Sequence, residues 1–295
     1  MKVISIFGGT GFIGSELIDF LPKKKIEIRV FTHSKNKVSS LNSSHNVKFF
    51  YYKQPKDVQS KISGSDLIIN LVGILHESKN IKFVDAHQKL TRSIINVALK
   101  EKVKRYVHLS ALKADTPGNS KYLSSKLDSE DVVEKYYNNG EWTILRPSVV
   151  FGNKDSFINL FEKMVKYLPL IFLISPKAKF QPIYVKDLVH IIERTLYDKN
   201  SYNKKLNLGG PNILSFIEIL QLIMSSQDKK NILIPLNKSL SYLFVRILEL
   251  LPFKIITRDN LKSMEVDNTS PINDSYLHIN SLLSLESYLS KTKKL

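Results

Sequence analysis

Three side chains in this sequence have the types and spacing needed to move a proton to or from a carbonyl oxygen. Tyr122 and Lys126 are four residues apart, so on a helix they lie one turn apart on the same face. A lysine ammonium beside a phenol favours the phenolate and lowers the pKa of the tyrosine from about 10. Ser110, at the end of an apolar run, could hydrogen-bond the same oxygen. Ser110, Tyr122 and Lys126 therefore form the predicted catalytic group.

A glycine-rich turn follows the first apolar run of the chain. Residues 3–7 read as a strand, Gly8, Gly11 and Gly14 follow, and apolar residues then recur at helical spacing. Such glycines let a turn fold tightly against a pyrophosphate and let the helix sit close to the strand, with the helix N-terminus facing the phosphates. The order of strand, glycine turn and helix predicts a dinucleotide-binding site. The predicted contacts from this turn are Gly8, Thr10, Gly11, Phe12, Ile13 and Gly14.

The end of the second expected strand bears on the choice of nucleotide. Residues 26–32 read as this strand, and the tip carries His33, Ser34 and Lys35 without an acid. A carboxylate there would bind the ribose 2′-hydroxyl, whereas a base would accept a 2′-phosphate. We therefore expect NADP(H) in preference to NAD(H), with NAD(H) as the alternative if these are ordinary surface residues. The predicted cofactor contacts beyond the glycine turn are His33, Ser34, Leu71, Val72, Gly73, Lys126, Pro147 and Val149.

Strands and helices alternate through the first half of the chain, which predicts an α/β fold with a doubly wound parallel sheet of the Rossmann type. From residue 153 the alternation is less regular, so we expect a smaller C-terminal α/β lobe. The expected strands after the second are 47–51, 66–72, 106–110 and 141–147. The predicted NAD(P)-binding domain is 1–152, with 180–210 returning to it, and the smaller substrate- or partner-binding lobe is 153–179 with 211–295.

The composition is that of an ordinary globular protein, with 43% hydrophobic and 24% charged residues among 295. The absence of cysteine excludes disulfides, thiol nucleophiles and cysteine-ligated metals. His87 and His108 have no second ligand at a telling spacing, so no metal site is predicted. The first strand begins at residue 2, so we expect either a bacterial cytoplasmic protein or a sequence written as a mature form, without its leader peptide. No run approaches the roughly 20 apolar residues that span a bilayer. We expect a cytoplasmic protein.

The formal net charge is +17, and its basic excess is scattered through turns and helix ends. A solvated lysine-rich surface is therefore favoured over a nucleic-acid interface, and no nucleic-acid partner is expected. Residues 240–251 form an amphipathic stretch. Core packing is the favoured interpretation of its apolar side, with a membrane- or partner-facing helix as the alternative.

Several blocks of the sequence together resemble one family. These blocks are residues 8–14, 69–75, 120–123 with 126, 146–152, 180–185, 251–252, 256–259 and 267–268. On them the chain resembles the extended and atypical short-chain dehydrogenase/reductase superfamily, and within it is most similar to the nucleotide-binding accessory subunit of respiratory complex I and its bacterial homologues. The resemblance implies tight NADPH binding on a Rossmann lobe and, for the complex I subunit, a structural nucleotide without turnover. Relatives often carry arginine where this chain has His33.

The leading hypothesis is an NAD(P)(H)-binding accessory protein with a structural nucleotide, associated with complex I or quinone metabolism. Its expected partners are complex I subunits or the membrane surface, at the cytoplasmic face of the inner membrane or on the matrix side in a mitochondrion. The alternative is an active NADPH-dependent reductase or NAD-dependent epimerase/dehydratase acting on a small carbonyl or sugar-nucleotide substrate. In that enzyme Tyr122 would be the acid/base, Lys126 would tune it and Ser110 would hold the substrate carbonyl.

Overall fold

The chain folds into two compact units in the computed structural model. The structure describes residues 2–21, 26–33, 46–78, 80–138, 140–250 and 256–292. Unit 1 comprises Met1–Ala111, Ser125–Arg146 and Leu188–Leu206, and unit 2 comprises Leu112–Ser124, Pro147–Asp187 and Asn207–Leu295. This division assigns residues 112–124 to unit 2, whereas the sequence placed them in the nucleotide-binding domain. The predicted domain boundaries stay a prediction.

A seven-stranded sheet of order β11-β6-β5-β4-β1-β2-β3 forms the centre of unit 1. The register pairs among β1 to β6 are all parallel, so the predicted doubly wound Rossmann-type sheet is confirmed. The chain winds outward from β1 to β3 and then returns to the other side of β1, where β4 pairs with it. The strands are β1 (Lys2–Phe7), β2 (Ile26–Thr32), β3 (Val47–Tyr51), β4 (Leu67–Asn70), β5 (Arg105–Leu109), β6 (Glu141–Pro147) and β11 (Lys204–Leu208).

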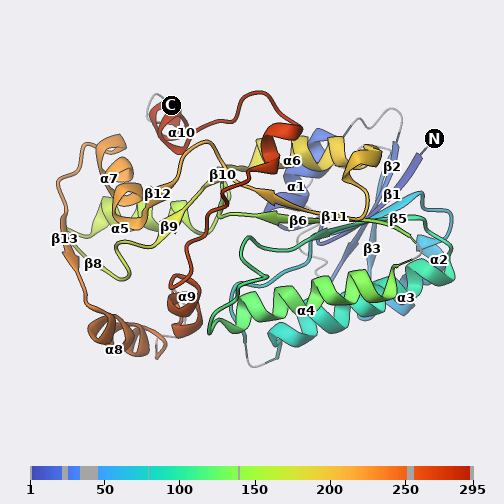
Figure 1. Ribbon diagram of the computed structural model, residues 1–295, viewed down its shortest axis with the longest axis horizontal. Coiled ribbons are helices and arrows are strands. Elements are labelled where there is room, and N and C mark those ends of the chain that lie inside the picture. Colours follow the sequence, from blue (N-terminus) through green and yellow to red (C-terminus); the bar gives the residue numbers. More distant parts are fainter. Residues whose placement is uncertain are drawn as a thin grey trace. The chain divides into compact units, whose positions relative to one another are not determined.

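Helices cover both faces of this sheet. Figure 1 shows α3 and α4 along one face and α1 and α6 along the other. Strands β4 and β5 are buried at every residue, as expected for parallel strands with helices on both sides. The helical elements that lie wholly or mainly in unit 1 are α1 (Phe12–Phe20), η1 (Pro55–Val58), α2 (Gln59–Ile62), the π-helix η2 (Val84–Lys89), α3 (Leu90–Lys100), α4 (Lys121–Tyr136), α6 (Val185–Thr195) and η3 (Lys199–Ser201).

Unit 2 has short two-stranded pairs and helices around a core rich in phenylalanine. Phe161 packs against Phe216 and Phe157 with ring centroids 5.0 and 5.1 Å apart. Its helical elements are α5 (Ile158–Tyr167), α7 (Phe216–Ser226), α8 (Lys238–Leu248), α9 (Arg258–Ser263), η4 (Asp274–Leu277) and α10 (Leu285–Thr292). Its strands are β7 (Val150–Phe151), β8 (Leu170–Leu173), β9 (Lys179–Phe180), β10 (Ile183–Tyr184), β12 (Leu214–Ser215) and β13 (Ile232–Pro235).

Helix α8 corrects one prediction from the sequence. The apolar side of residues 240–251 was expected to pack in the core. In the structure α8 buries Val245, whereas Leu240, Leu243 and Ile247 are 49%, 57% and 57% exposed. Apolar residues occur on more than one side of this helix, so periodicity alone could not tell which side meets the core. Residue 251 lies outside the described residues.

The first helix approaches the turn after β1 closely. A Cβ atom added at Gly14 would lie 2.5 Å from the carbonyl oxygen of Gly8 and 2.5 Å from the Cα of Gly9. Both are backbone atoms, so no side chain can move aside to make room. This contact fixes where α1 begins relative to β1.

A Gly14→Ala substitution should therefore push α1 away from the turn. Overpacking against backbone costs about 3 kcal/mol, at the upper end of the usual range. We expect a loss of this size in the free energy of unfolding, measured by urea denaturation. Glu16→Ala, two residues further along the same helix, is the control and should change stability by less than about 0.5 kcal/mol. A Gly14→Ala protein as stable as the parent would contradict this account of the turn.

Candidate functional site

The glycine turn presents backbone donors in a form that suits a phosphate. Gly8 has φ +78°, and a Cβ there would lie 2.9 Å from the carbonyl carbon of Leu71. The Gly11 N–H donates to the Gly8 carbonyl at 3.0 Å and closes the turn. In the described part of the chain, no side chain caps the N-terminus of α1, so the N–H groups of Phe12 and Ile13 remain available to donate hydrogen bonds to a ligand. These features fit the pyrophosphate of a dinucleotide.

The loop after β4 lies beside this turn. The Leu71 N–H donates to the Phe7 carbonyl at 2.9 Å, and the Val72 N–H donates to Oδ1 of Asn70 at 3.1 Å. A Cβ added at Gly8 would also lie 3.0 Å from the Val72 nitrogen. The structure therefore places Leu71 and Val72 next to the glycine turn, and their role as cofactor contacts stays a prediction.

The end of β2 is described as far as His33. The hydroxyls of Thr10 and Thr32 lie 3.1 Å apart, and His33 is exposed with its ring 4.0 Å from that of Tyr52. The described residues at this strand end include no carboxylate. Ser34, a predicted cofactor contact, lies outside the described residues. The Thr10 hydroxyl thus lies beside the end of β2, and the cofactor roles of Thr10 and His33 stay a prediction.

Lys126 is buried in unit 1 and has a defined partner. Its ammonium donates to the Leu109 carbonyl at 3.0 Å, and the side chain is only 4% exposed. A Cβ added at Gly73 would lie 3.1 Å from Nζ, so the loop after β4 contacts the ammonium. Burial lowers the pKa of Lys126 to about 8, with the charge of Glu130 opposing the shift. Lys126 therefore still carries its proton at neutral pH.

Tyr122 lies in the first turn of α4, which a residue far along the chain holds in place. Asp259 accepts hydrogen bonds from the N–H groups of Lys121 and Tyr122 at 2.7 and 2.9 Å and from the Ser120 hydroxyl at 3.2 Å. The sequence expected a lowered phenol pKa, but burial raises the pKa of Tyr122 to about 12. Tyr122 is therefore a neutral phenol at neutral pH.

The Ser110 hydroxyl is engaged inside unit 1. It donates to Oε1 of Glu130 at 2.5 Å, and Arg146 pairs with the same carboxylate through Nε at 2.9 Å and Nη2 at 2.6 Å. Ser110 is 4% exposed and Glu130 is fully buried. A serine that gives its proton to a buried carboxylate cannot donate it to a substrate at the same time. The catalytic role of Ser110 stays a prediction, and it requires this hydrogen bond to break.

Pro147 and Val149 belong to unit 2, where Asn268 holds the segment that contains them. Oδ1 of Asn268 accepts from the Ser148 hydroxyl at 2.5 Å and from the Val149 N–H at 3.2 Å. The Pro147 carbonyl accepts from the Leu112 N–H at 2.9 Å. In the sequence, Asn268 stands out only through the family resemblance. Nothing in the sequence signals its contact with a segment over a hundred residues earlier.

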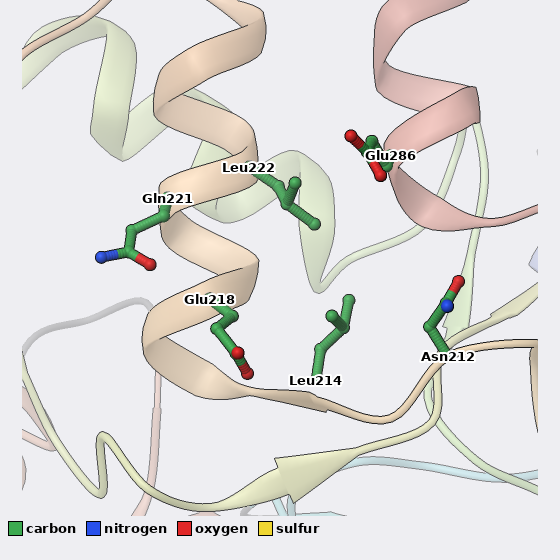
Figure 2. Close-up of a pocket in the computed structure, with 6 residues that line it drawn as sticks. All are labelled: Asn212, Leu214, Glu218, Gln221, Leu222 and Glu286. Atoms are coloured by element: carbon green, nitrogen blue, oxygen red, sulfur yellow. The ribbon is translucent and has the colours of Figure 1, made fainter.

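A cavity of about 320 Å³ in unit 2 is formed by other residues. Its lining is Asn212, Leu214, Glu218, Gln221, Leu222 and Glu286. Figure 2 shows them coming from α7, from the segment before α7 and from α10. Glu218 accepts from the N–H and hydroxyl of Ser215, at 2.7 and 2.6 Å, and so serves as a helix cap. No predicted site residue lines this cavity.

Within the described ranges, no three His, Cys, Asp or Glu side chains gather as they would around a metal ion. Over the same ranges, none of the helices has the length and hydropathy needed to cross a bilayer.

The parallel sheet, the glycine turn and the buried lysine define a protein of the NAD(P)-binding Rossmann class. Residues 4–209 match the model of the NAD dependent epimerase/dehydratase family, so the chain belongs to that family. The match extends over both the glycine turn and the segment with Tyr122 and Lys126.

Curated relatives carry the name of a respiratory-chain subunit. The chain is 30% identical over 236 residues to NADH dehydrogenase (ubiquinone) 1 alpha subcomplex subunit 9, mitochondrial, of Arabidopsis thaliana, a match that covers 75% of this chain and 57% of that protein. The chain thus spans less than two thirds of the plant protein. It is 26% identical over 278 residues to the protein of the same name in Mus musculus, covering 91% of this chain and 73% of that one.

Solved structures of low sequence identity share the fold. Triphenylmethane reductase of Citrobacter sp. has a TM-score of 0.80 at 19% identity, with 99% of this chain and 100% of that chain covered. An NADPH-dependent quinone oxidoreductase of Escherichia coli, solved with NADPH, has a TM-score of 0.77 at 13% identity, with 99% and 98% covered. These likenesses support the Rossmann-type fold.

Removing the charge of Glu130 should be costly. A Glu130→Gln substitution leaves Arg146 buried without its counter-charge, and breaking such a pair costs about 3–5 kcal/mol. We expect a loss of this size in the free energy of unfolding, measured by urea denaturation. Glu134→Gln, one turn later on α4, is the matched control. Glu134 is 38% exposed and pairs with Lys205, so its loss should cost less than about 1 kcal/mol. Equal effects of the two changes would contradict a buried pair.

Two buried neutral histidines predict lower stability in mild acid. Burial, with the nearby Lys126 charge, lowers the pKa of His87 to about 2 and that of His108 to about 3. Below the unfolded pKa of about 6.5, the unfolded chain binds protons that the folded chain does not. The free energy of unfolding should therefore decrease as the pH is lowered, by on the order of 2 kcal/mol per histidine from pH 7 to pH 5.

Urea denaturation across this range measures the effect. His108→Gln removes one titrating group and should lose about half of the slope that the two histidines produce. A His108→Gln protein with the full slope of the parent would show that His108 is not held neutral.

Proposed function

We propose that this protein binds NADP(H) on its glycine turn and keeps it as a structural group, as an accessory protein of the complex I type. The observation that carries the structural role is the 2.5 Å hydrogen bond from Ser110 to Glu130. It occupies the hydroxyl that the enzyme alternative needs for a substrate carbonyl. Arg146 on the same carboxylate makes this arrangement costly to break.

The phenol of Tyr122 supports the same proposal. Proton transfer is efficient when the pKa of the group lies near the working pH. The pKa of Tyr122 is raised to about 12, so the group is a weak acid and is almost never a phenolate at neutral pH. A bound nicotinamide could supply a hydride. The Tyr122 phenol, however, is poorly suited to supply or accept the proton that must move with it.

In this proposal, different segments of unit 1 bind different parts of the nucleotide. The amides of the glycine turn, from Gly8 to Gly14, hold the pyrophosphate. Leu71, Val72 and Gly73 flank it, and the ammonium of Lys126 binds hydroxyl oxygens of the ribose next to the nicotinamide. Thr10 and His33 face the other ribose, where the absence of a described acid supports NADP(H) over NAD(H).

The names of the curated relatives support complex I subunits as partners. We place the protein against such subunits or the membrane surface, on the cytoplasmic face of the inner membrane or on the matrix side in a mitochondrion. The exposed Leu240, Leu243 and Ile247 on α8, together with the net charge of +17, suit a contact with a protein or lipid surface.

A second candidate function is an NADPH-dependent reductase or an NAD-dependent epimerase/dehydratase. It is favoured by the placement of Tyr122 and Lys126 one turn apart on α4 and by the chemistry named for the solved structures of similar fold. In this case the Ser110 hydroxyl would have to leave Glu130 when substrate binds.

The Tyr122→Phe variant separates the two functions. It removes one hydroxyl, so under the structural role it binds NADPH as the parent does, and neither protein oxidises NADPH with carbonyl compounds or quinones. Absorbance of the reduced nicotinamide measures this. Tyr136→Phe, at the other end of α4, is the matched control. NADPH oxidation that Tyr122→Phe abolishes and Tyr136→Phe retains would favour the enzyme.

A further inference from the structure

His87 lies on the π-helical turn η2, directly before α3. π-Turns are rare and often mark functional sites. The side chain is 1% exposed and its ring packs beside that of Phe83, with centroids 5.7 Å apart. Neither the glycine turn nor the proton-transfer group includes this residue.

The two ring nitrogens of His87 bond to two different segments of unit 1. Nε2 accepts from the backbone N–H of Ile74 at 3.0 Å, and Nδ1 lies 2.8 Å from the hydroxyl oxygen of Ser125. Ile74 is in the loop after β4, and Ser125 immediately precedes Lys126 in α4. A Cβ added at Gly73 would lie 3.1 Å from Nζ of Lys126 and 3.7 Å from Nε2 of His87. The loop, the ring and the ammonium are therefore in contact.

These partners fix the tautomer of the ring. The Ile74 N–H can only donate, so Nε2 carries no proton. The proton of the neutral ring is then on Nδ1 and is donated to Ser125. A second proton on Nε2 would break the bond to Ile74 and place a charge next to the ammonium of Lys126. Burial, with the charge of Lys126, lowers the pKa of His87 to about 2, so the ring stays neutral at physiological pH.

We propose that His87 is a positioning residue for the bound dinucleotide. His87 fixes the loop at Gly73 and Ile74 against Lys126. The proposal rests on the proposed nucleotide binding at the ends of β1 and β4. His87 acts through Ile74 and Ser125 and does not touch the nucleotide. Without the ring, the loop would become ordered only when the nucleotide binds. The conformational entropy lost in that ordering would weaken the binding.

His108 provides a matched control within the same unit. It is also 1% exposed, and its Nε2 lies 2.9 Å from the hydroxyl of Ser129, which is likewise on α4. Its other nitrogen lies 3.5 Å from the amide nitrogen of Asn70, whose Oδ1 accepts from the Val72 N–H. That amide nitrogen also bonds to Thr91 and Tyr106, so Asn70 stays anchored without His108. Loss of His108 should therefore lower stability without loosening the loop.

The experiment compares His87→Leu, His87→Gln and His108→Leu in the full chain. Titration calorimetry with NADPH measures affinity, and hydrogen exchange of the free proteins measures opening of residues 71–75. We expect His87→Leu to weaken NADPH binding about tenfold, the equivalent of one or two hydrogen bonds, and to speed exchange in 71–75 but not in β5. His87→Gln keeps an acceptor for Ile74, so it should recover most of the affinity. His108→Leu should bind within about twofold of the parent.

If His87→Leu binds NADPH no more weakly than His108→Leu and exchanges like the parent in 71–75, the inference is overturned. If His87→Leu does not fold, His87→Gln and His87→Asn replace it. Asparagine keeps only the donor to Ser125, so it should bind more weakly than glutamine, and the reverse order would overturn the inference. If the parent binds no dinucleotide, the proposed function fails, and exchange at 71–75 still decides whether His87 holds the loop.

Discussion

The close approach of helix α1 to the turn after β1 is the constraint on which the rest of the structure depends. Only a residue without a Cβ can occupy position 14, because the backbone of Gly8 and Gly9 lies 2.5 Å from where that atom would be. Helix α1 begins at this approach, and no side chain among the described residues caps its first amides. It lies where the sheet order reverses between β1 and β4, the position at which open α/β sheets bind ligands.

Under the proposed structural role, the buried polar groups of unit 1 keep the motif of Tyr122 and Lys126 from acting in catalysis. Glu130 lies one turn after Lys126 on α4 and holds both the Ser110 hydroxyl and the Arg146 guanidinium. A carboxylate buried in this way must be paired and hydrogen-bonded, so it fixes its partners firmly. The same helix therefore carries a proton-transfer motif and the group that occupies its expected serine. In the proposed function, this combination favours retention of a nucleotide over turnover.

The sequence predicted the fold well because its signals were local. Strands 26–32 and 47–51 match β2 and β3, whereas the strand expected at 66–72 ends at Asn70, whose side chain accepts from the Val72 N–H in the loop that follows. The site was predicted less completely because its contacts are distant in sequence. No pattern reports that Asp259 caps α4 or that Glu130 binds Ser110. Spacing also suggested a lowered pKa for Tyr122, but burial, which spacing does not describe, has the opposite effect.

The central claim is that the backbone at the start of this chain holds a nicotinamide dinucleotide. Mass spectrometry of the small molecules released when the purified protein is denatured tests it most directly. The account predicts a stoichiometric amount of dinucleotide, with the mass of the 2′-phosphorylated form. Protein that releases none, and whose melting temperature neither NADPH nor NADH raises, would contradict it.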